Sequence, residues 1–241
     1  MVKFLLRPDD AHKGMMGHSL LIVGRYGMAG AGILAAKACL RSGVGKVTVH
    51  IPKRNNDILQ ISVPEAIVSH DSDDFIISDA SVLKDDIIKG TYRSIAVGPG
   101  IGTDGRTAFM LKALLSDMQN SVHTPLVLDA DALNILSQHV DMFQLLPENT
   151  ILTPHPAELH RLLSACVSFD GDVNAESASI FELHSSLLTL GKDNASITLP
   201  SLNRSLVFLP CENVHPNKSL HYGKSNQATS FHAFEPCPRA V

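Results

Sequence analysis

Cysteine is scarce in this sequence of 241 residues, and no two cysteines form a C-x-x-C pair. The four that occur are widely separated, at Cys39, Cys166, Cys211 and Cys237. This spacing argues against a structural zinc site and against a dithiol redox motif. The histidines form no H-x3-H helical pair either, so we expect no metal site.

Long apolar runs and clusters of positive charge are also missing. No run approaches the roughly 18 apolar residues of a membrane-spanning helix, and the apolar part of the first seven residues is too short for a signal peptide. We therefore expect a cytoplasmic protein that does not bind membranes. The net charge of −4 and the lack of a cationic run argue against nucleic acid as a partner and favour a small molecule.

The sequence does contain enough apolar residues, 44%, for one large globular domain. Up to about residue 165, short apolar runs alternate with helical patterns. This alternation predicts an α/β fold with a largely parallel sheet covered by helices on both faces. We expect strands at Ser19–Val23, Lys46–Ile51, Ser94–Val97, Leu126–Leu128 and Thr150–Leu152, and helices near Ala31–Arg41, Thr107–Met118, Asp131–Leu136 and Ala157–Leu163.

The composition changes after about residue 166. Of the 16 glycines, 13 lie at or before Gly105, and serine, asparagine and histidine become frequent afterwards. Residues 195–209 can still form one or two strands, but we expect poorly ordered chain from Pro216 onward. We therefore divide the chain into a folded domain, residues 1–165, and a divergent, partly disordered tail, residues 166–241.

Four of the expected strands end in loops of unusual composition. Loops at the carboxyl ends of parallel strands open on the same edge of the sheet, where α/β proteins bind their ligands. We therefore expect a single site formed by residues 24–32, 98–102, 129–131 and 153–156.

The first of these loops, GRYGMAGAG, allows three interpretations. Gly30 and Gly32 fit the dinucleotide pattern G-x-G-x-x-A, but Gly30 lies seven residues beyond Val23 and no acidic residue ends the second strand. Alternatively, the glycines let backbone amides and the start of a helix approach an anionic group. The third interpretation is close packing of the helix on the sheet.

The glycines of the second loop, residues 98–102, either let a ligand lie against bare backbone or simply turn the chain into the next helix. Thr103 and Asp104 are an N-cap pair for that helix. In the third loop, Asp129 can bind a metal or act as a base, whereas Asp131 is favoured as a helix cap.

Histidine is the remaining candidate ligand. His155 lies between two prolines that fix the backbone on both sides, which favours a ligand contact over a surface role. Near the first strand, His12 and His18 are candidates to reach the same edge of the sheet.

Taken together, these motifs resemble the ADP- or ATP-dependent NAD(P)H-hydrate dehydratases, which have a three-layer, ribokinase-like fold. The resemblance covers residues 12 to about 165, roughly two thirds of the chain. It is carried by His12-Lys13-Gly14, Gly17-His18, Gly27-Met28-Ala29-Gly30-Ala31, ACLRSGVGKVTV, GPGIG, LVLDADALNIL and ILTPHPAEL.

The resemblance implies a metabolite-repair enzyme, a lyase. Its family uses ADP or ATP, with Mg2+, to phosphorylate the hydroxyl of (6S)-NAD(P)H hydrate and then eliminates the phosphate to restore NAD(P)H. The positions that contact the hydrate in the family fall on Ala31, on Gly98 and Gly100 of the second loop, and on His155. Glu158, in the following helix, is a weaker candidate.

The nucleotide half of the family pattern has no counterpart in this sequence. Family members continue with a Lys-Gly segment and a G-[ST]-G-D turn whose aspartate is the catalytic base. Here the segment most similar to Lys-Gly is Gly191-Lys192, in the reversed order, and no aspartate follows Asp193. The sequence therefore predicts that the C-terminal part of the fold is incomplete and that activity is in doubt, with the base and the nucleotide-binding residues unassigned.

Two explanations of this ending stay open. Either the chain is a family member that has lost catalysis, or its reading frame shifts near residue 165; the abrupt end of the resemblance favours the frameshift. The other functions to consider are a non-catalytic nucleotide- or dinucleotide-binding module and a ribokinase-like small-molecule kinase.

The resemblance also implies a partner. In many bacteria the dehydratase is the second half of a longer protein whose first half epimerises the hydrate. This sequence starts almost directly at the dehydratase motifs, so we expect a fragment or a separate gene for that half. An incomplete sheet would expose apolar surface, so homo-oligomers are also expected.

Overall fold

The computed structural model describes residues 9–119, 124–147, 150–169, 195–199 and 204–208. The expectation of poorly ordered chain from Pro216 onward lies outside these residues.

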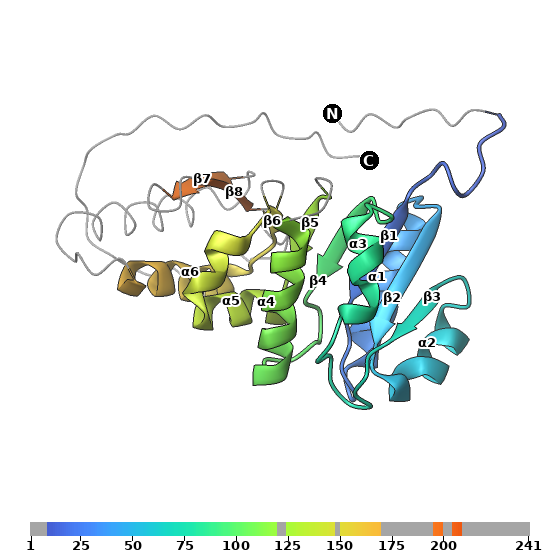
Figure 1. Ribbon diagram of the computed structural model, residues 1–241, viewed down its shortest axis with the longest axis horizontal. Helices are drawn as coiled ribbons and strands as arrows, with labels where there is room; N and C mark the ends of the chain where they lie inside the picture. Colours follow the sequence, from blue (N-terminus) through green and yellow to red (C-terminus); the bar gives the residue numbers. More distant parts are fainter. Residues whose placement is uncertain (1–8, 120–123, 148–149, 170–194, 200–203, 209–241) are drawn as a thin grey trace, which may run out of the picture.

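One eight-stranded sheet forms the centre of the protein (Figure 1), with the strand order β3-β2-β1-β4-β5-β6-β8-β7. All neighbouring strands are parallel except β7, which pairs antiparallel with β8. The strands are β1 His18–Ile22, β2 Lys46–Ile51, β3 Ile67–His70, β4 Ser94–Val97, β5 Leu126–Leu128, β6 Thr150–Leu152, β7 Ala195–Leu199 and β8 Arg204–Phe208.

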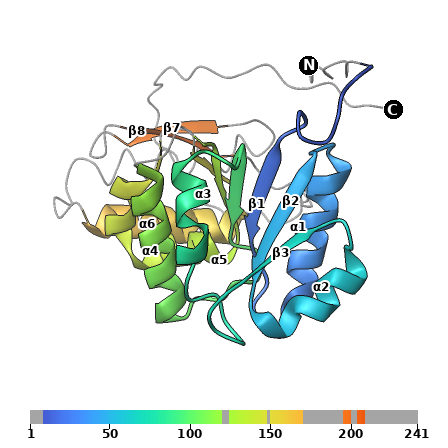
Figure 2. The same cartoon turned by 45° about the vertical axis from the view of Figure 1, so that its right-hand side comes forward.

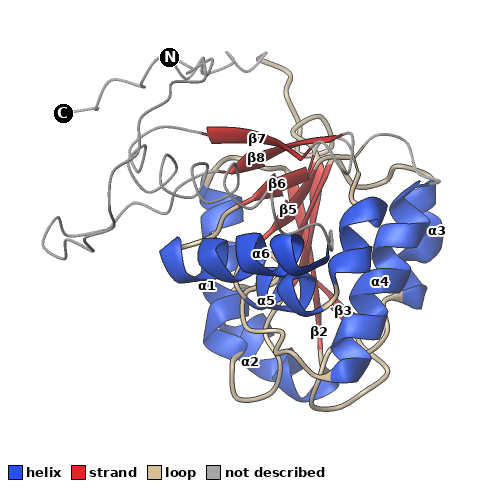
Figure 3. Ribbon diagram, turned by 90° about the vertical axis from the view of Figure 1, so that its left-hand side faces the viewer, coloured by secondary structure: helices blue, strands red, loops and turns tan. Residues whose placement is uncertain are grey.

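Helices cover both faces of this sheet, with α1 and α2 on one side and α3 and α4 on the other (Figures 2 and 3). The α-helices are α1 Ala29–Arg41, α2 Asn56–Ser62, α3 Lys84–Ile88, α4 Gly105–Gln119, α5 Asp131–Gln138 and α6 Pro156–Phe169. Three short 3-10 helices are η1 Lys53–Asn55, η2 Ser81–Leu83 and η3 Val140–Leu145.

The two faces of β1 lead into two separate apolar cores. Leu21 and Val23 pack with α1, α2 and β2, whereas Leu20 and Ile22 belong to the larger core with α3, α4, α5 and α6. This alternation is what a strand buried on both faces requires. The expected three-layer α/β fold with a largely parallel sheet is therefore confirmed.

Several elements were not expected from the sequence. Strand β3 lies at the edge of the sheet and is only partly buried, and α2 and α3 are just seven and five residues long. Short elements with weak burial carry too little hydrophobic periodicity to be recognised. No helix in the described part of the chain is long and apolar enough to cross a membrane.

Candidate functional site

The direction of strand addition reverses between β1 and β4. Strands β2 and β3 extend the sheet on one side of this point, and β5 and β6 extend it on the other. Ligands of doubly wound sheets bind outside the carboxyl ends of the strands at such a switch point. The loops that leave β1 and β4 here are the two glycine-rich segments, residues 24–32 and 98–102.

Backbone hydrogen bonds join these two loops directly. The amide of Gly24 donates to the carbonyl oxygen of Pro99 at 2.9 Å, and the amide of Arg25 donates to that of Gly100 at 2.6 Å. Gly100 has a φ of +70°, and a Cβ built on it would lie only 2.9 Å from the Cβ of Ala31. The fold thus brings together Ala31 and Gly100, which come from separate loops.

Gly98 is required by the packing of the sheet. Its φ is +139°, and a Cβ there would lie 1.7 Å from the carbonyl oxygen of Asp129. The chain that follows β5 therefore fills the space that a side chain would need. Close packing against Asp129, which neither interpretation of this loop included, accounts for the glycine at position 98.

Ala130, in the turn after β5, has a strained backbone conformation. Ala130 has φ 50° and ψ −117°, and among the described residues it is the only non-glycine with a positive φ. Such strain is concentrated at functional sites. The carboxylate of Asp129 accepts a hydrogen bond from the hydroxyl of Thr153 at 2.8 Å, which links this turn to the loop after β6.

The prediction that Asp131 caps α5 is wrong. Ala130 is the N-cap residue and makes no side-chain cap, while the Asp131 carboxylate accepts the amide hydrogen of Gly102 at 2.8 Å. Asp131 therefore binds the loop after β4 instead of the first turn of its own helix. The expected cap at Asp104 is confirmed, because its carboxylate accepts the amide of Arg106 at 2.9 Å.

His155 caps helix α6 with its own ring. Its Nδ1 accepts the amide hydrogen of Ala157 at 3.1 Å, so the neutral ring carries its proton on Nε2. That nitrogen lies 3.1 Å from Oε1 of Glu158, whose Oε2 accepts the backbone amide of His155 at 2.9 Å. Glu158 is buried, whereas the His155 side chain is 50% exposed, so the carboxylate holds a half-exposed ring in place.

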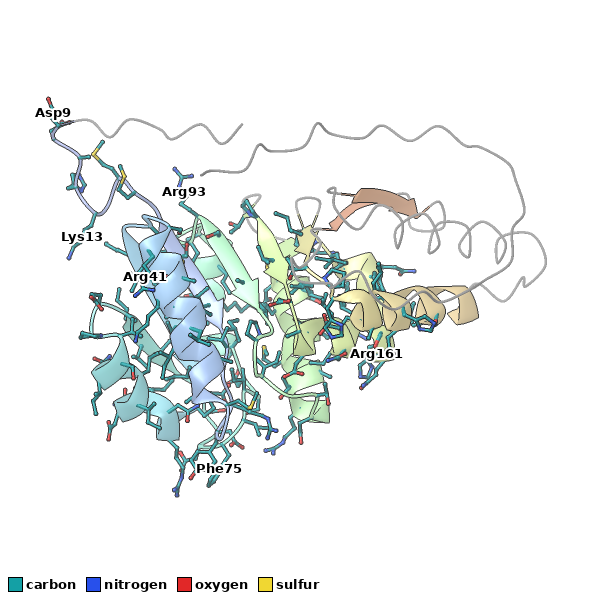
Figure 4. The ribbon with its side chains drawn as sticks, turned by 180° about the vertical axis from the view of Figure 1, so that it is seen from behind. Asp9, Lys13, Arg41, Phe75, Arg93 and Arg161 are labelled. Atoms are coloured by element: carbon teal, nitrogen blue, oxygen red, sulfur yellow. The ribbon has the colours of Figure 1, made fainter. Side chains whose placement is uncertain are left out.

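The expectation that His12 and His18 reach this site is wrong. His18 is the first residue of β1, at the opposite end of the strand from the site. There its ring packs against Tyr92 and hydrogen-bonds to Thr48. His12 lies with Lys13 near Gly45, just before β2, and Figure 4 shows Lys13 far from Phe75. His12 precedes β1 and His18 begins it, so both lie at the amino end of this strand.

Two parts of this edge were not foreseen from the sequence. Asn55 is 2% exposed and its side-chain amide donates to the carbonyl oxygens of Gly24 and Arg25, at 2.9 and 3.1 Å. Residues 71–79, after β3, lie beside the first glycine loop, and the amide of Tyr26 donates to the carbonyl oxygen of Phe75 at 2.7 Å. Neither a single buried asparagine nor an acidic loop produces the hydrophobic periodicity from which elements are predicted.

A buried carboxylate organises residues 71–79. Asp71 is 1% exposed and accepts hydrogen bonds from the amides of Asp73, Ser78 and Asp79. The Nε2 of His50 lies 3.3 Å from Oδ2 of Asp71 and 2.9 Å from the carbonyl oxygen of Asp79. Burial alone would raise the pKa of Asp71, but the hydrogen bonds from His50 and the three amides outweigh it and lower the pKa to about 2.

This pKa predicts a loss of stability in acid. A folded-state pKa below the ordinary 3.8 means that the Asp71 carboxylate stabilises the fold above about pH 4 and ceases to do so as the pH falls through 2. The free energy of unfolding should drop by about 2 kcal/mol over this range on account of Asp71. The Asp71→Asn variant should lack that component and be about 2 kcal/mol less stable at pH 7.

Urea titrations at pH 7, 4 and 2.5 measure both effects. Asp74→Asn is the matched control, because Asp74 is half exposed and its ion pair with Arg54 is 3.9 Å long. Equal stability losses in the two variants at pH 7 would contradict the role assigned to Asp71.

No group of three or more histidine, cysteine, aspartate or glutamate side chains that could hold a metal occurs among the described residues. Within that part of the chain, the candidate ligand contacts are Ala31 and Gly100, which lie against each other, and the half-exposed His155.

A family model described as NAD(P)H-hydrate dehydratase matches residues 19–207. The chain belongs to this family. The match includes all the strand-end loops described above and continues through β7 almost to the end of β8.

Several relatives of the NAD(P)H-hydrate dehydratase family resemble this chain. The "ADP-dependent (S)-NAD(P)H-hydrate dehydratase" of Staphylococcus aureus is 36% identical over 156 residues, which cover 65% of this chain and 52% of the relative. The "Bifunctional NAD(P)H-hydrate repair enzyme Nnr" of Coxiella burnetii is 39% identical over 158 residues, covering 65% and 29%. The chain thus spans about half, or less, of these relatives.

Solved structures agree with the family. A ribokinase-like superfamily protein from Enterococcus faecalis superimposes with a TM-score of 0.58 at 25% identity, covering 85% of this chain and 66% of that protein. The ribokinase-like fold expected from the sequence is therefore confirmed.

Proposed function

We propose that the loops at the switch point bind the hydrated nicotinamide of (6S)-NAD(P)H hydrate, the substrate whose ADP-dependent dehydration restores NAD(P)H. The observation that supports this most is the direct contact of the two glycine-rich loops, Ala31 against Gly100, where a doubly wound sheet binds its ligand. Membership of the NAD(P)H-hydrate dehydratase family supplies the chemical identity of that ligand.

The candidate residues divide by what they can do. Ala31, Gly98 and Gly100 would shape a surface of small side chains and bare backbone for the ligand. His155 would present its ring to the ligand from the start of α6, and Glu158 would act on the ligand only by holding that ring. Both ring nitrogens are engaged within the chain, Nδ1 by the amide of Ala157 and Nε2 by the Glu158 carboxylate, so a ligand would meet the exposed part of a ring held in a fixed orientation.

The same proposal includes ADP or ATP with Mg2+ as cosubstrate, a cytoplasmic location, and association with an epimerase unit or with further copies of the chain. Mg2+ in a nucleotide site is held mainly by phosphate oxygens and water with one or two carboxylates, so the described residues, which include no cluster of three ligands, do not locate the nucleotide. We therefore assign no reaction step to the nucleotide. We also keep the division of the chain near residue 165, with binding retained before it and catalysis lost after it.

A substitution in the first turn of α1 tests this site. Gly30 is exposed and a Cβ on it would meet nothing within 4 Å, so the fold does not explain why glycine stands beside Ala31. We expect NADPH hydrate to raise the unfolding midpoint of the unsubstituted chain and to raise that of Gly30→Leu little or not at all. Without ligand, Gly30→Leu should be as stable or slightly more stable, because leucine favours a helix over glycine by about 0.5 kcal/mol or more.

Ala38→Leu is the matched control, since Ala38 is exposed on the same helix two turns further along. Its midpoint should rise with NADPH hydrate as the unsubstituted chain's does. If NADPH hydrate raised the midpoint of Gly30→Leu as much as that of the unsubstituted chain, the ligand would bind elsewhere.

A further inference from the structure

Arg25 is a positioned cation that no carboxylate among the described residues pairs with. Its amide donates to Gly100 and its carbonyl oxygen accepts from Asn55 at 3.1 Å, so its backbone is fixed at the switch point. Its side chain passes over Gly102, where a Cβ would lie 2.9 Å from Cδ and 3.1 Å from Nε of Arg25. Glycine at position 102, with a φ of +79°, leaves the space in which this side chain lies.

The neighbouring arginines differ in this respect. The guanidinium of Arg106 pairs with Asp73 at 2.9 Å and with Asp104 at 3.4 Å, and that of Arg54 lies 3.9 Å from Asp74. Within the described ranges, no carboxylate pairs with Arg25. Its charge is therefore available to an anion from solution, and a guanidinium fork matches the oxygens of a phosphate.

An aromatic surface lies directly beside this cation. The rings of Tyr26 and Phe75 meet edge to face, with centroids 5.3 Å apart and planes at 86°, and remain 49% and 46% exposed. The buried Asp71 fixes the loop that carries Phe75, which Figure 4 shows at the same edge of the sheet as the start of α1. The Arg54 guanidinium lies over the Phe75 ring, 4.7 Å from its centroid, so the half-exposed Tyr26 ring is the one offered to a ribose or a base.

We infer that Arg25 and Tyr26 form a subsite for the phosphate-bearing, nucleotide end of the dinucleotide. Arg25 binds a phosphate oxygen, and the Tyr26 ring packs against the adjoining ribose or base. This inference rests on the proposed function, which places the hydrated nicotinamide a few residues away at Ala31 and Gly100. The other source of the same chemistry is a phosphate of ADP, and the test includes it.

The test measures dissociation constants of NADPH hydrate and of ADP for the full chain, for Arg25→Gln and for Arg93→Gln, at low and high ionic strength. Arg93 is the matched control because it is exposed just before β4, at the far edge of the sheet from Phe75 (Figure 4). Loss of a charged hydrogen bond to phosphate should weaken binding of NADPH hydrate to Arg25→Gln about tenfold or more. Added salt should weaken binding less in Arg25→Gln than in the other two proteins.

The outcomes separate this inference from the proposed function. Failure of the unsubstituted chain to bind NADPH hydrate would overturn the proposed function and the subsite with it. If the unsubstituted chain binds and Arg25→Gln binds equally well, with the same salt dependence, the subsite alone is overturned. A loss confined to ADP would also overturn it. Equal unfolding midpoints of the three unligated proteins would exclude misfolding as the cause of a loss.

Discussion

The full chain, supplied with NADH hydrate, ADP and Mg2+, should regenerate no NADH above the uncatalysed rate. The resemblance to the dehydratases places the base in a glycine-rich turn that ends in aspartate. After Gly105 this chain has only Gly171, Gly191 and Gly223, and no aspartate follows Asp193. A positioned base contributes about 10²- to 10⁴-fold to such a reaction, and a donor that stabilises developing charge adds about 10²- to 10³-fold.

The recovery of NADH absorbance measures this turnover. The Staphylococcus aureus relative, assayed in parallel, provides the positive control. Without both contributions, the chain should be slower than that relative by a factor of about 10⁴ or more. Recovery at a rate close to that of the relative would show that residues outside the expected pattern supply the base.

The Gly98→Ala variant should be severely destabilised, by about 3 kcal/mol or more, or should fail to fold. A Cβ at this position would stand 1.7 Å from the carbonyl oxygen of Asp129, and the φ of +139° is one that alanine rarely adopts. Relief requires movement of the chain between β5 and α5, whose amide at Asp129 is bonded to Val97. Overpacking and backbone strain each cost about 1–3 kcal/mol, and here they act together.

Gly105→Ala is the matched control for Gly98→Ala. Gly105 begins α4, has no positive φ, and a Cβ on it would meet nothing within 4 Å. Urea unfolding should place Gly105→Ala within about 0.5 kcal/mol of the unsubstituted chain. Similar stabilities for the two variants would contradict the close contact between Gly98 and Asp129.

The sequence alone predicted the central strands well. The bounds expected for β2, β4, β5 and β6 match those of the structure, because each is a short apolar run buried on both faces of a parallel sheet. The hairpin of β7 and β8 also follows the expected β-type runs. The edge strand β3 was missed because half of its side chains are exposed and its residues show no clear alternation.

The candidate site was predictable only at the level of loops. Parallel topology placed the loops after β1, β4, β5 and β6 at one edge, and that deduction needed no knowledge of contacts. The contacts themselves depend on residues distant in sequence. Asp131 bonds Gly102 instead of capping its helix, and Asp71 depends on His50, so neither partner could be read from local sequence.

His155 shows the same limit within a single turn of helix. Its two flanking prolines indicated a fixed position, and the structure agrees. The ring, however, is engaged by the amide of Ala157 and by Glu158, and only the geometry reveals which nitrogen carries the proton.

The measurement that bears most directly on this account is a titration of the full chain with NADPH hydrate, in the absence of ADP, followed by its unfolding midpoint. If the loops at the switch point bind the hydrate, the midpoint should rise steadily with ligand concentration. The stabilisation should reach about 2.7 kcal/mol when the ligand is at 100 times its dissociation constant. An unchanged midpoint, at concentrations that shift the Staphylococcus aureus relative, would contradict the central claim that this chain retains the hydrate-binding half of the site.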